Sequence, residues 1–235
     1  FESLISASQT GALWTMVPQG LNDRVIYAGN LLKHSRKEQD STLVQRYFYL
    51  QGNYLVYKNS LESTKPSAAM HLKFVKLSLL KDDCPDVPST QRRLAFKLSR
   101  GSKFTVLFAN NFQELEQWIN VLTQVTLRSD IHERFTIEKG IGAGSFAQVF
   151  RATEITTGRL FAVKGFNKSA VLQSPVGKES LWKEIEITRS ISGKKNVVTL
   201  YEVHETKNSV YLIMELIEGG DFESFIRSSN NTPRD

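Results

Sequence analysis

Two segments in the second half of the chain carry residues that could handle a phosphate. Residues 141–149 read Ile-Gly-Ala-Gly-Ser-Phe-Ala-Gln-Val, and Lys164 follows at the end of the run Phe-Ala-Val-Lys. Glycines let a backbone close over phosphates because no Cβ is in the way, and a lysine supplies a point charge to them. This combination indicates a nucleotide site and predicts ATP as its ligand.

Two other phosphate-binding arrangements fit the flanking residues less well. A dinucleotide site needs its glycines to open a helix, but residues 148–153 contain β-branched and aromatic residues and predict a second strand. An ATPase P-loop needs Gly-Lys-Ser or Gly-Lys-Thr directly after the loop, and that run is absent. After a turn at Thr157-Gly158, a third strand is predicted over 160–166, with the lysine inside it.

The elements after the lysine strand are predicted to pack against it. Apolar residues recur at helical spacing between Lys178 and Ser192, and this pattern predicts a helix lying on the sheet. They are Leu181, Ile185, Thr188 and either Ile187 or Ile191. Trp182 on this helix is interpreted as a packing residue. A strand over 197–203 and a turn at 207–209 follow, and the apolar run 210–216 predicts a buried strand.

This order of elements resembles the small lobe of a eukaryotic protein kinase. The resemblance implies that Lys164 orients the phosphates of ATP and that Glu184 on the helix holds the lysine in place, with Glu186 as the less favoured candidate. The ATP-binding residues that it implies are Ile141, Gly142, Ala143, Gly144, Ser145, Phe146, Val149, Ala162, Lys164, Glu184, Met214, Glu215, Ile217 and Asp221.

Several of these positions have a specific role in the resemblance. Met214 would be the gatekeeper, although simple core packing explains it equally well. Glu215 and Ile217 would offer backbone groups to the adenine edge, and Asp221 would reach the ribose. Ala147 stands where the family has a third glycine. The run Asn-Val-Val-Thr-Leu-Tyr-Glu-Val at 196–203, with Met-Glu-Leu at 214–216, resembles calmodulin-dependent and related serine/threonine kinases.

The resemblance also implies functional groups that this sequence does not contain. A catalytic-loop aspartate and a magnesium-binding aspartate would have to follow Asp235. We therefore expect a fragment with the small lobe and hinge only, which has no catalytic residue and no metal ligand and is inactive alone. The whole protein is predicted to be an ATP-dependent protein serine/threonine kinase that uses Mg²⁺ and a protein substrate. The alternative is a non-catalytic lipid- or protein-binding adaptor with a degenerate or truncated kinase lobe.

The first half of the chain contains a series of short strand-like runs. They cover residues 26–33, 45–50, 54–58, 73–80, 94–98 and 104–108. Turns at Gln51-Gly52-Asn53 and Arg100-Gly101-Ser102 predict hairpins between neighbouring runs.

A single amphipathic helix ends this half. Asn111 and Glu114 predict a capping box, and one helix face is apolar. That face comprises Phe112, Leu115, Trp118, Ile119, Leu122 and Val125. An antiparallel barrel capped by such a helix, with Trp118 in its core, resembles a pleckstrin-homology (PH) domain. The predicted fold class is therefore α+β in two domains, this barrel and then a five-stranded antiparallel sheet with a helix.

The PH resemblance implies a test for lipid binding, and the sequence meets it in part. Lys33 and Arg46 stand at two basic positions typical of phosphoinositide binders, but Val44 occupies the third. An arginine there would grip a phosphate with two hydrogen bonds, which valine cannot do. Arg36, Lys37 and Lys58 would add diffuse attraction, each about 1 kcal/mol near an anionic leaflet. Headgroup recognition and ordinary solvated strand ends both remain open.

The net charge of +6 lies entirely in the residues up to Arg128. This asymmetry favours an anionic membrane surface or an acidic partner for the first half. It does not indicate a nucleic-acid binder, because no RNA-binding signature accompanies it. The only cysteine is Cys84, so no internal disulfide can form, and a reducing, cytoplasmic location is predicted. The basic PH-like half adds the expectation of peripheral association with a membrane.

These patterns divide the chain into four parts. We expect an N-terminal extension over 1–23, a PH-like domain over 24–128, a linker over 129–134 and kinase small lobe and hinge over 135–235. The six residues of the linker span at most about 20 Å. The two domains must therefore lie side by side.

Overall fold

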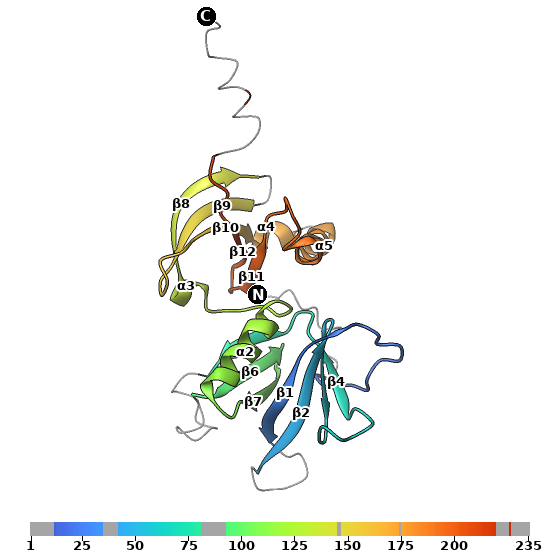
Figure 1. Ribbon diagram of the computed structural model, residues 1–235. Helices are drawn as coiled ribbons and strands as arrows, with labels where there is room; N and C mark the ends of the chain where they lie inside the picture. Colours follow the sequence, from blue (N-terminus) through green and yellow to red (C-terminus); the bar gives the residue numbers. More distant parts are fainter. Residues whose placement is uncertain are drawn as a thin grey trace, which may run out of the picture.

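The computed structural model describes residues 12–34, 42–80, 93–144, 147–173, 175–219 and 226. Two antiparallel sheets form the protein, one from each half of the chain. The sheet of the first half and its helix lie directly against the sheet of the second half (Figure 1). The side-by-side arrangement predicted from the short linker is confirmed.

The first half forms seven strands and one helix. The strands are β1 (Val25–His34), β2 (Leu43–Gln51), β3 (Tyr54–Lys58), β4 (Ala68–His71), β5 (Lys76–Leu79), β6 (Ala95–Arg100) and β7 (Lys103–Phe108), and the helix is α2 (Phe112–Thr123). Their order in the sheet is β4-β3-β2-β1-β7-β6-β5. One core takes side chains from all seven strands and from α2, so the sheet curls round it as the predicted barrel, with Trp118 fully buried inside.

The ends of α2 and β5 differ in detail from the prediction. The Asn111 side chain accepts the N–H of Glu114 at 2.9 Å, but the Glu114 carboxylate accepts from the N–H of Asn110 at 3.2 Å. Phe112 was predicted to line the apolar face and is 64% exposed, because it lies in the first turn at the edge of that stripe. The strand predicted over 73–80 begins only at Lys76, because residues 73–75 form a turn before β5. Strand β4 was not predicted.

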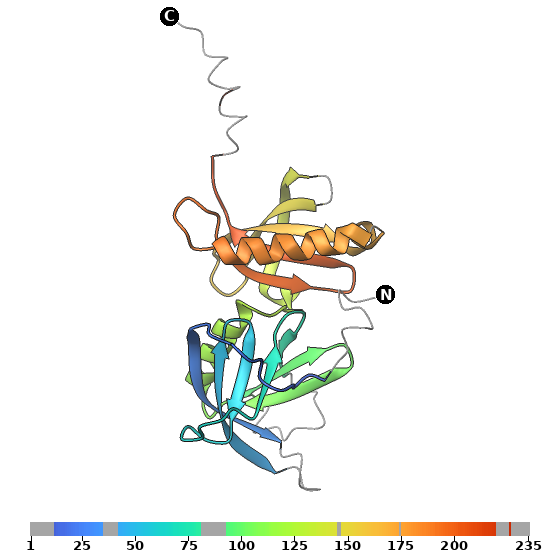
Figure 2. The ribbon, with the colours of Figure 1, turned by 90° about the vertical axis from the view of Figure 1, so that its right-hand side faces the viewer.

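The second half forms the five-stranded sheet predicted from the sequence. Its strands are β8 (Phe135–Ala143), β9 (Ala147–Glu154), β10 (Leu160–Asn167), β11 (Leu200–Glu205) and β12 (Ser209–Glu215), in the order β11-β12-β10-β9-β8. The long helix α5 (Pro175–Ile191) runs across one face of this sheet (Figure 2). Two short helices, α3 (Ile131–Arg134) and α4 (Lys168–Leu172), were not predicted.

The two sheets are joined through two consecutive residues, Leu127 and Arg128. The N–H of Leu127 donates to the Val75 carbonyl at 2.8 Å, and its carbonyl accepts from Leu77 at 2.7 Å. The N–H of Arg128 donates to the Val203 carbonyl at 2.8 Å, and its carbonyl accepts from Glu205 at 2.7 Å. Leu127 thus pairs with edge strand β5 of one sheet and Arg128 with edge strand β11 of the other.

Buried and half-buried ionisable groups surround this junction. Arg128 binds Asp130 through its Nε at 2.9 Å. Glu202 accepts from the guanidinium of Arg134 and lies 2.8 Å from Nε2 of the fully buried His204. Burial opposes the charge on Glu202, but His204 and Arg134 lower its pKa to about 2. Burial lowers the pKa of His204, so its ring is neutral at pH 7.

These two shifts predict that acid destabilises the junction. The unfolded chain takes up a proton on His204 below about pH 6.5 and on Glu202 below about pH 4.5, while the folded chain resists both. The free energy of unfolding should therefore fall from pH 6.5 towards pH 2, measured by urea unfolding at several pH values. Glu202→Gln should lower the free energy of unfolding at pH 7 by about 2 kcal/mol. It should also weaken the dependence of that free energy on pH below pH 4.5.

The exposed pair of Glu179 and Lys183 provides the control. Its atoms lie 2.9 Å apart on the solvent side of α5, where water and salt screen the charges. Glu179→Gln should leave both the stability and its pH profile close to those of the unmodified chain. An unchanged profile in Glu202→Gln would show that the buried network does not set the acid sensitivity.

Candidate functional site

Five of the predicted ATP-binding residues lie on one face of the second sheet. Residues paired directly across antiparallel strands share a face, and alternate residues of a strand return to it. Lys164 is paired with Val149, which is paired in turn with Gly142. Ala162, two residues before Lys164, is paired with Met214. The register therefore gathers a glycine, a cation and three apolar side chains on the face that α5 partly covers.

The structure pairs Lys164 with Glu184. The lysine Nζ lies 2.5 Å from Oε1 of the glutamate, and the two side chains are 30% and 38% exposed. Helix α5 brings Glu184 there because Leu181 and Ile185 anchor it in the core of the sheet. Glu186, the less favoured candidate, points away and binds Lys73 of the barrel at 2.9 Å.

The glycine-rich hairpin stands at the open edge of this face. The N–H of Gly144 donates to the carbonyl of Ala147 at 2.8 Å, just beyond the end of β8 and at the start of β9. Ile141 and Ala143 are exposed at the end of β8. Ser145 and Phe146 lie outside the described residues. Residues 141–144 are therefore accessible beside Lys164, as a phosphate-covering loop requires.

The hinge positions follow β12. Met214 is half-buried and packs against the core under α5. The N–H of Glu215 donates to the Thr199 carbonyl at 2.9 Å, so Glu215 could offer adenine only its carbonyl. Ile217 is exposed in the segment after the strand, and Asp221 lies outside the described residues.

These residues fit a nucleotide better than a free metal ion. The small side chain of Ala162 leaves an apolar sheet surface next to the charged Lys164. Such a surface suits an adenine ring, and the lysine suits the phosphate chain attached to it. Within the described ranges, no group of three or more His, Cys, Asp or Glu residues is arranged to hold a metal.

The barrel places Lys33 and Arg46 on one face of two paired strands. Lys33 is paired with Val44 and Arg46 with Leu31, so both basic residues share the core-facing side with Leu31. Lys33 is only 8% exposed. Its Nζ lies 4.2 Å from the ring centroid of Tyr57 and 5.3 Å from that of Trp14. The lysine is held against aromatic rings by cation–π attraction.

The other predicted headgroup residues are not gathered with this pair. Lys58 is paired with Tyr47, which places it on the opposite face of the sheet, over the ring of Tyr49. Arg36 and Lys37 lie outside the described residues.

Sequence reasoning missed the aromatic partners of Lys33. Trp14 comes from the expected N-terminal extension, yet it packs in the barrel core, and the neighbouring Thr15 pairs with Ala69 of β4. The only signal available was a tryptophan in a segment with no other assigned role.

Comparison with known families agrees with both halves of the fold. Residues 25–127 match the PH domain and residues 135–235 match the protein kinase domain. The chain is therefore a PH domain followed by the small-lobe region of a protein kinase domain.

The individual relatives are protein kinases. The chain is 29% identical over 140 residues to calcium-dependent protein kinase 14 of Arabidopsis thaliana, a match that covers 59% of this chain and 26% of the relative. It is 37% identical over 111 residues to the probable serine/threonine-protein kinase pXi of Dictyostelium discoideum, covering 47% and 15%. It is 36% identical over 109 residues to calcium/calmodulin-dependent protein kinase type 1 of Caenorhabditis briggsae, covering 46% and 30%. The matches thus span less than a third of each relative.

Proposed function

We propose that this chain is the PH domain and ATP-binding lobe of an ATP-dependent protein serine/threonine kinase. The observation that carries the proposal is the contact between Lys164 and Glu184. Lys164 lies on the same sheet face as Ala162 and Met214, and this half of the chain matches the protein kinase domain. Serine and threonine as acceptors are inferred from the relatives, of which one is named a serine/threonine kinase.

In the proposed reaction, this lobe binds and orients the nucleotide. The Lys164 ammonium would contact phosphate oxygens, and Glu184 would stop the long lysine side chain from leaving that position. Gly142 and Gly144 would let the hairpin backbone approach the phosphates. Mg²⁺ would neutralise charge on the phosphates, and we propose that its ligands and the group that accepts the substrate proton lie outside the described residues.

Replacing Lys164 by methionine tests this role. Met keeps the length of the side chain and removes the charge, so the protein with a complete kinase domain should lose at least roughly 100-fold in turnover. The measurement is transfer of labelled phosphate to a protein substrate, with thermal unfolding to confirm the fold. Lys139→Met, at an exposed position on β8, should retain activity.

The same assay distinguishes the adaptor alternative. If the unmodified protein binds ATP or partners but transfers no phosphate, the adaptor function replaces the kinase proposal. If Lys164→Met retains full turnover, the phosphate-orienting role of this lysine is wrong.

We also propose that the PH domain binds anionic lipid mainly through Arg46, with Lys33 beside it on the same face but largely buried against Tyr57 and Trp14. The excess positive charge of the chain lies in this half, and the two side chains share one face near the end of the β1–β2 pair. Among the described residues, no helix is both long enough and apolar enough to cross a membrane. Peripheral binding of this kind would account for a PH domain in front of a kinase lobe.

Arg46 and Lys58 form a matched pair for a lipid test. Arg46→Ala removes a charge from the proposed face, whereas Lys58→Ala removes one from the opposite face. Binding to vesicles that contain 5% phosphoinositide should weaken roughly tenfold in Arg46→Ala, because an Arg–phosphate contact is lost, and at most slightly in Lys58→Ala. Equal effects of the two variants would indicate only diffuse attraction, and no effect of either would favour a protein-binding role.

A further inference from the structure

The turn between β4 and β5 of the barrel holds a phenylalanine in an unusual backbone conformation. Phe74 has φ of +61°, in the left-handed region that bulky residues rarely adopt. Its ring is buried, but it belongs to the core of the kinase sheet rather than to that of the barrel. Strain of this kind persists only where surrounding contacts enforce it, so the contacts of this ring are informative.

The ring of Phe74 packs on Trp182 of α5. The ring centroids lie 4.3 Å apart, with 37° between the ring planes. The neighbouring Lys73 reinforces the contact, since its Nζ lies 5.2 Å from the Trp182 ring and 2.9 Å from Glu186. Partial burial opposes the charge on Glu186, but the lysine lowers the pKa of that carboxyl below its ordinary value.

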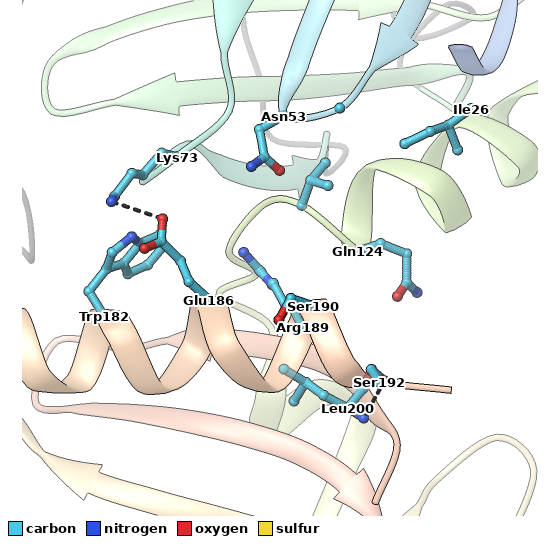
Figure 3. A pocket seen from close by; sticks show the side chains of 12 residues that line it. Ile26, Asn53, Lys73, Gln124, Trp182, Glu186, Arg189, Ser190, Ser192 and Leu200 are labelled. Carbon is cyan, nitrogen blue, oxygen red and sulfur yellow. Dashed lines mark hydrogen bonds and ion pairs between the residues drawn. The ribbon is translucent and has the colours of Figure 1, made fainter. Parts of the chain in front are cut away.

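A third contact lies one turn further along the same helix face. Arg189 donates through Nη2 to the carbonyl of Thr126 at 2.5 Å. Trp182, Glu186 and Arg189 are spaced by four and three residues, so they form a single stripe of α5. Figure 3 shows this stripe facing Lys73 and the barrel, and the stripe and Lys73 line a cavity of about 400 Å³.

Glu184 projects from a different side of the helix. Two residues along a helix correspond to a rotation of about 200°, so Glu184 faces away from the barrel when Trp182 faces it. Leu181 and Ile185 fill the space between helix and sheet. Because Trp182, Glu184 and Arg189 project from one helix, a translation of α5 that withdraws Glu184 from Lys164 would also strain the contacts of Trp182 with Phe74 and of Arg189 with Thr126.

We propose that Phe74, supported by Lys73, is a positioning residue for phosphoryl transfer: this turn of the PH domain presses on Trp182 and Glu186 and so keeps Glu184 against Lys164. The inference rests on the proposed kinase function. Phe74 itself touches neither ATP nor the reacting atoms. It acts through α5, and the backbone strain at Phe74 is the local cost of placing an aromatic ring at the surface of the kinase lobe.

Phe74→Gly is the most informative variant. Glycine adopts a positive φ without steric cost, so this change removes the ring while it relieves the strain in the barrel. In the protein with a complete kinase domain, we expect kcat/KM for ATP to fall about tenfold, while KM for the protein substrate stays unchanged. Hydrogen exchange of the α5 amides should become faster in the same variant. Phe112→Ala, at an exposed barrel phenylalanine, should change neither measurement.

A charge swap tests the supporting lysine independently. Lys73→Glu and Glu186→Lys each place like charges together at the contact and should each lower kcat/KM for ATP. The double variant restores an opposite pair and should recover most of the loss, which a general destabilisation of the barrel would not do.

The outcomes separate this inference from the proposed function. Suppose that Phe74→Gly keeps the kcat/KM for ATP and the α5 hydrogen-exchange rates of the unmodified protein, while Lys164→Met is inactive. The positioning role is then wrong and the kinase function stands. If the charge swap fails to recover activity, Lys73 has no part in positioning. If the unmodified full-length protein transfers no phosphate, both proposals are overturned.

Discussion

The backbone pairing of Leu127 and Arg128 with two different sheets fixes the arrangement of the whole molecule. Successive residues of an extended chain direct their hydrogen-bonding groups to opposite sides, so one dipeptide can bind β5 on one side and β11 on the other. Both are edge strands, whose free backbone groups need partners. Because the dipeptide cannot stretch, the barrel is held close to the kinase sheet, and the turn at Phe74 meets α5 as a result.

The kinase half could be predicted well because its signals are local or follow from order along the chain. β-branched, aromatic and apolar runs marked the strands. The kinase resemblance favoured Glu184 over Glu186 by its position within the helix and its distance from the next strands. The contact of Phe74 with Trp182 had no such signal. Residues 75–79 alternate like a strand and extend the predicted strand to Phe74, whereas the left-handed backbone of Phe74 depends on a tertiary contact between domains. Helices α3 and α4 are too short to produce a periodic pattern.

The barrel half shows a different limit of sequence reasoning. Strand β4 (Ala68–His71) has no β-branched residue and was missed for that reason. The grouping of Lys58 with Lys33, in contrast, could have been avoided. The hairpin between β2 and β3 has two loop residues, Gly52 and Asn53, with Gln51 paired to Tyr54. Counting outwards from that pair places Lys58 opposite Tyr47, and therefore on the other face from Arg46.

The barrel keeps its two proposed tasks at opposite ends. Strand β1 starts near α5, since Ile26 lines the cavity between the domains, and it runs away from the kinase sheet (Figure 1). Lys33 stands seven residues after Ile26, or about 23 Å along the strand. A lipid headgroup at Lys33 and Arg46 would therefore leave the contact between Phe74 and Trp182 in place. Membrane binding would then bring to the surface a kinase lobe whose helix α5 is already positioned, and release of α5 would need a separate event at the domain junction.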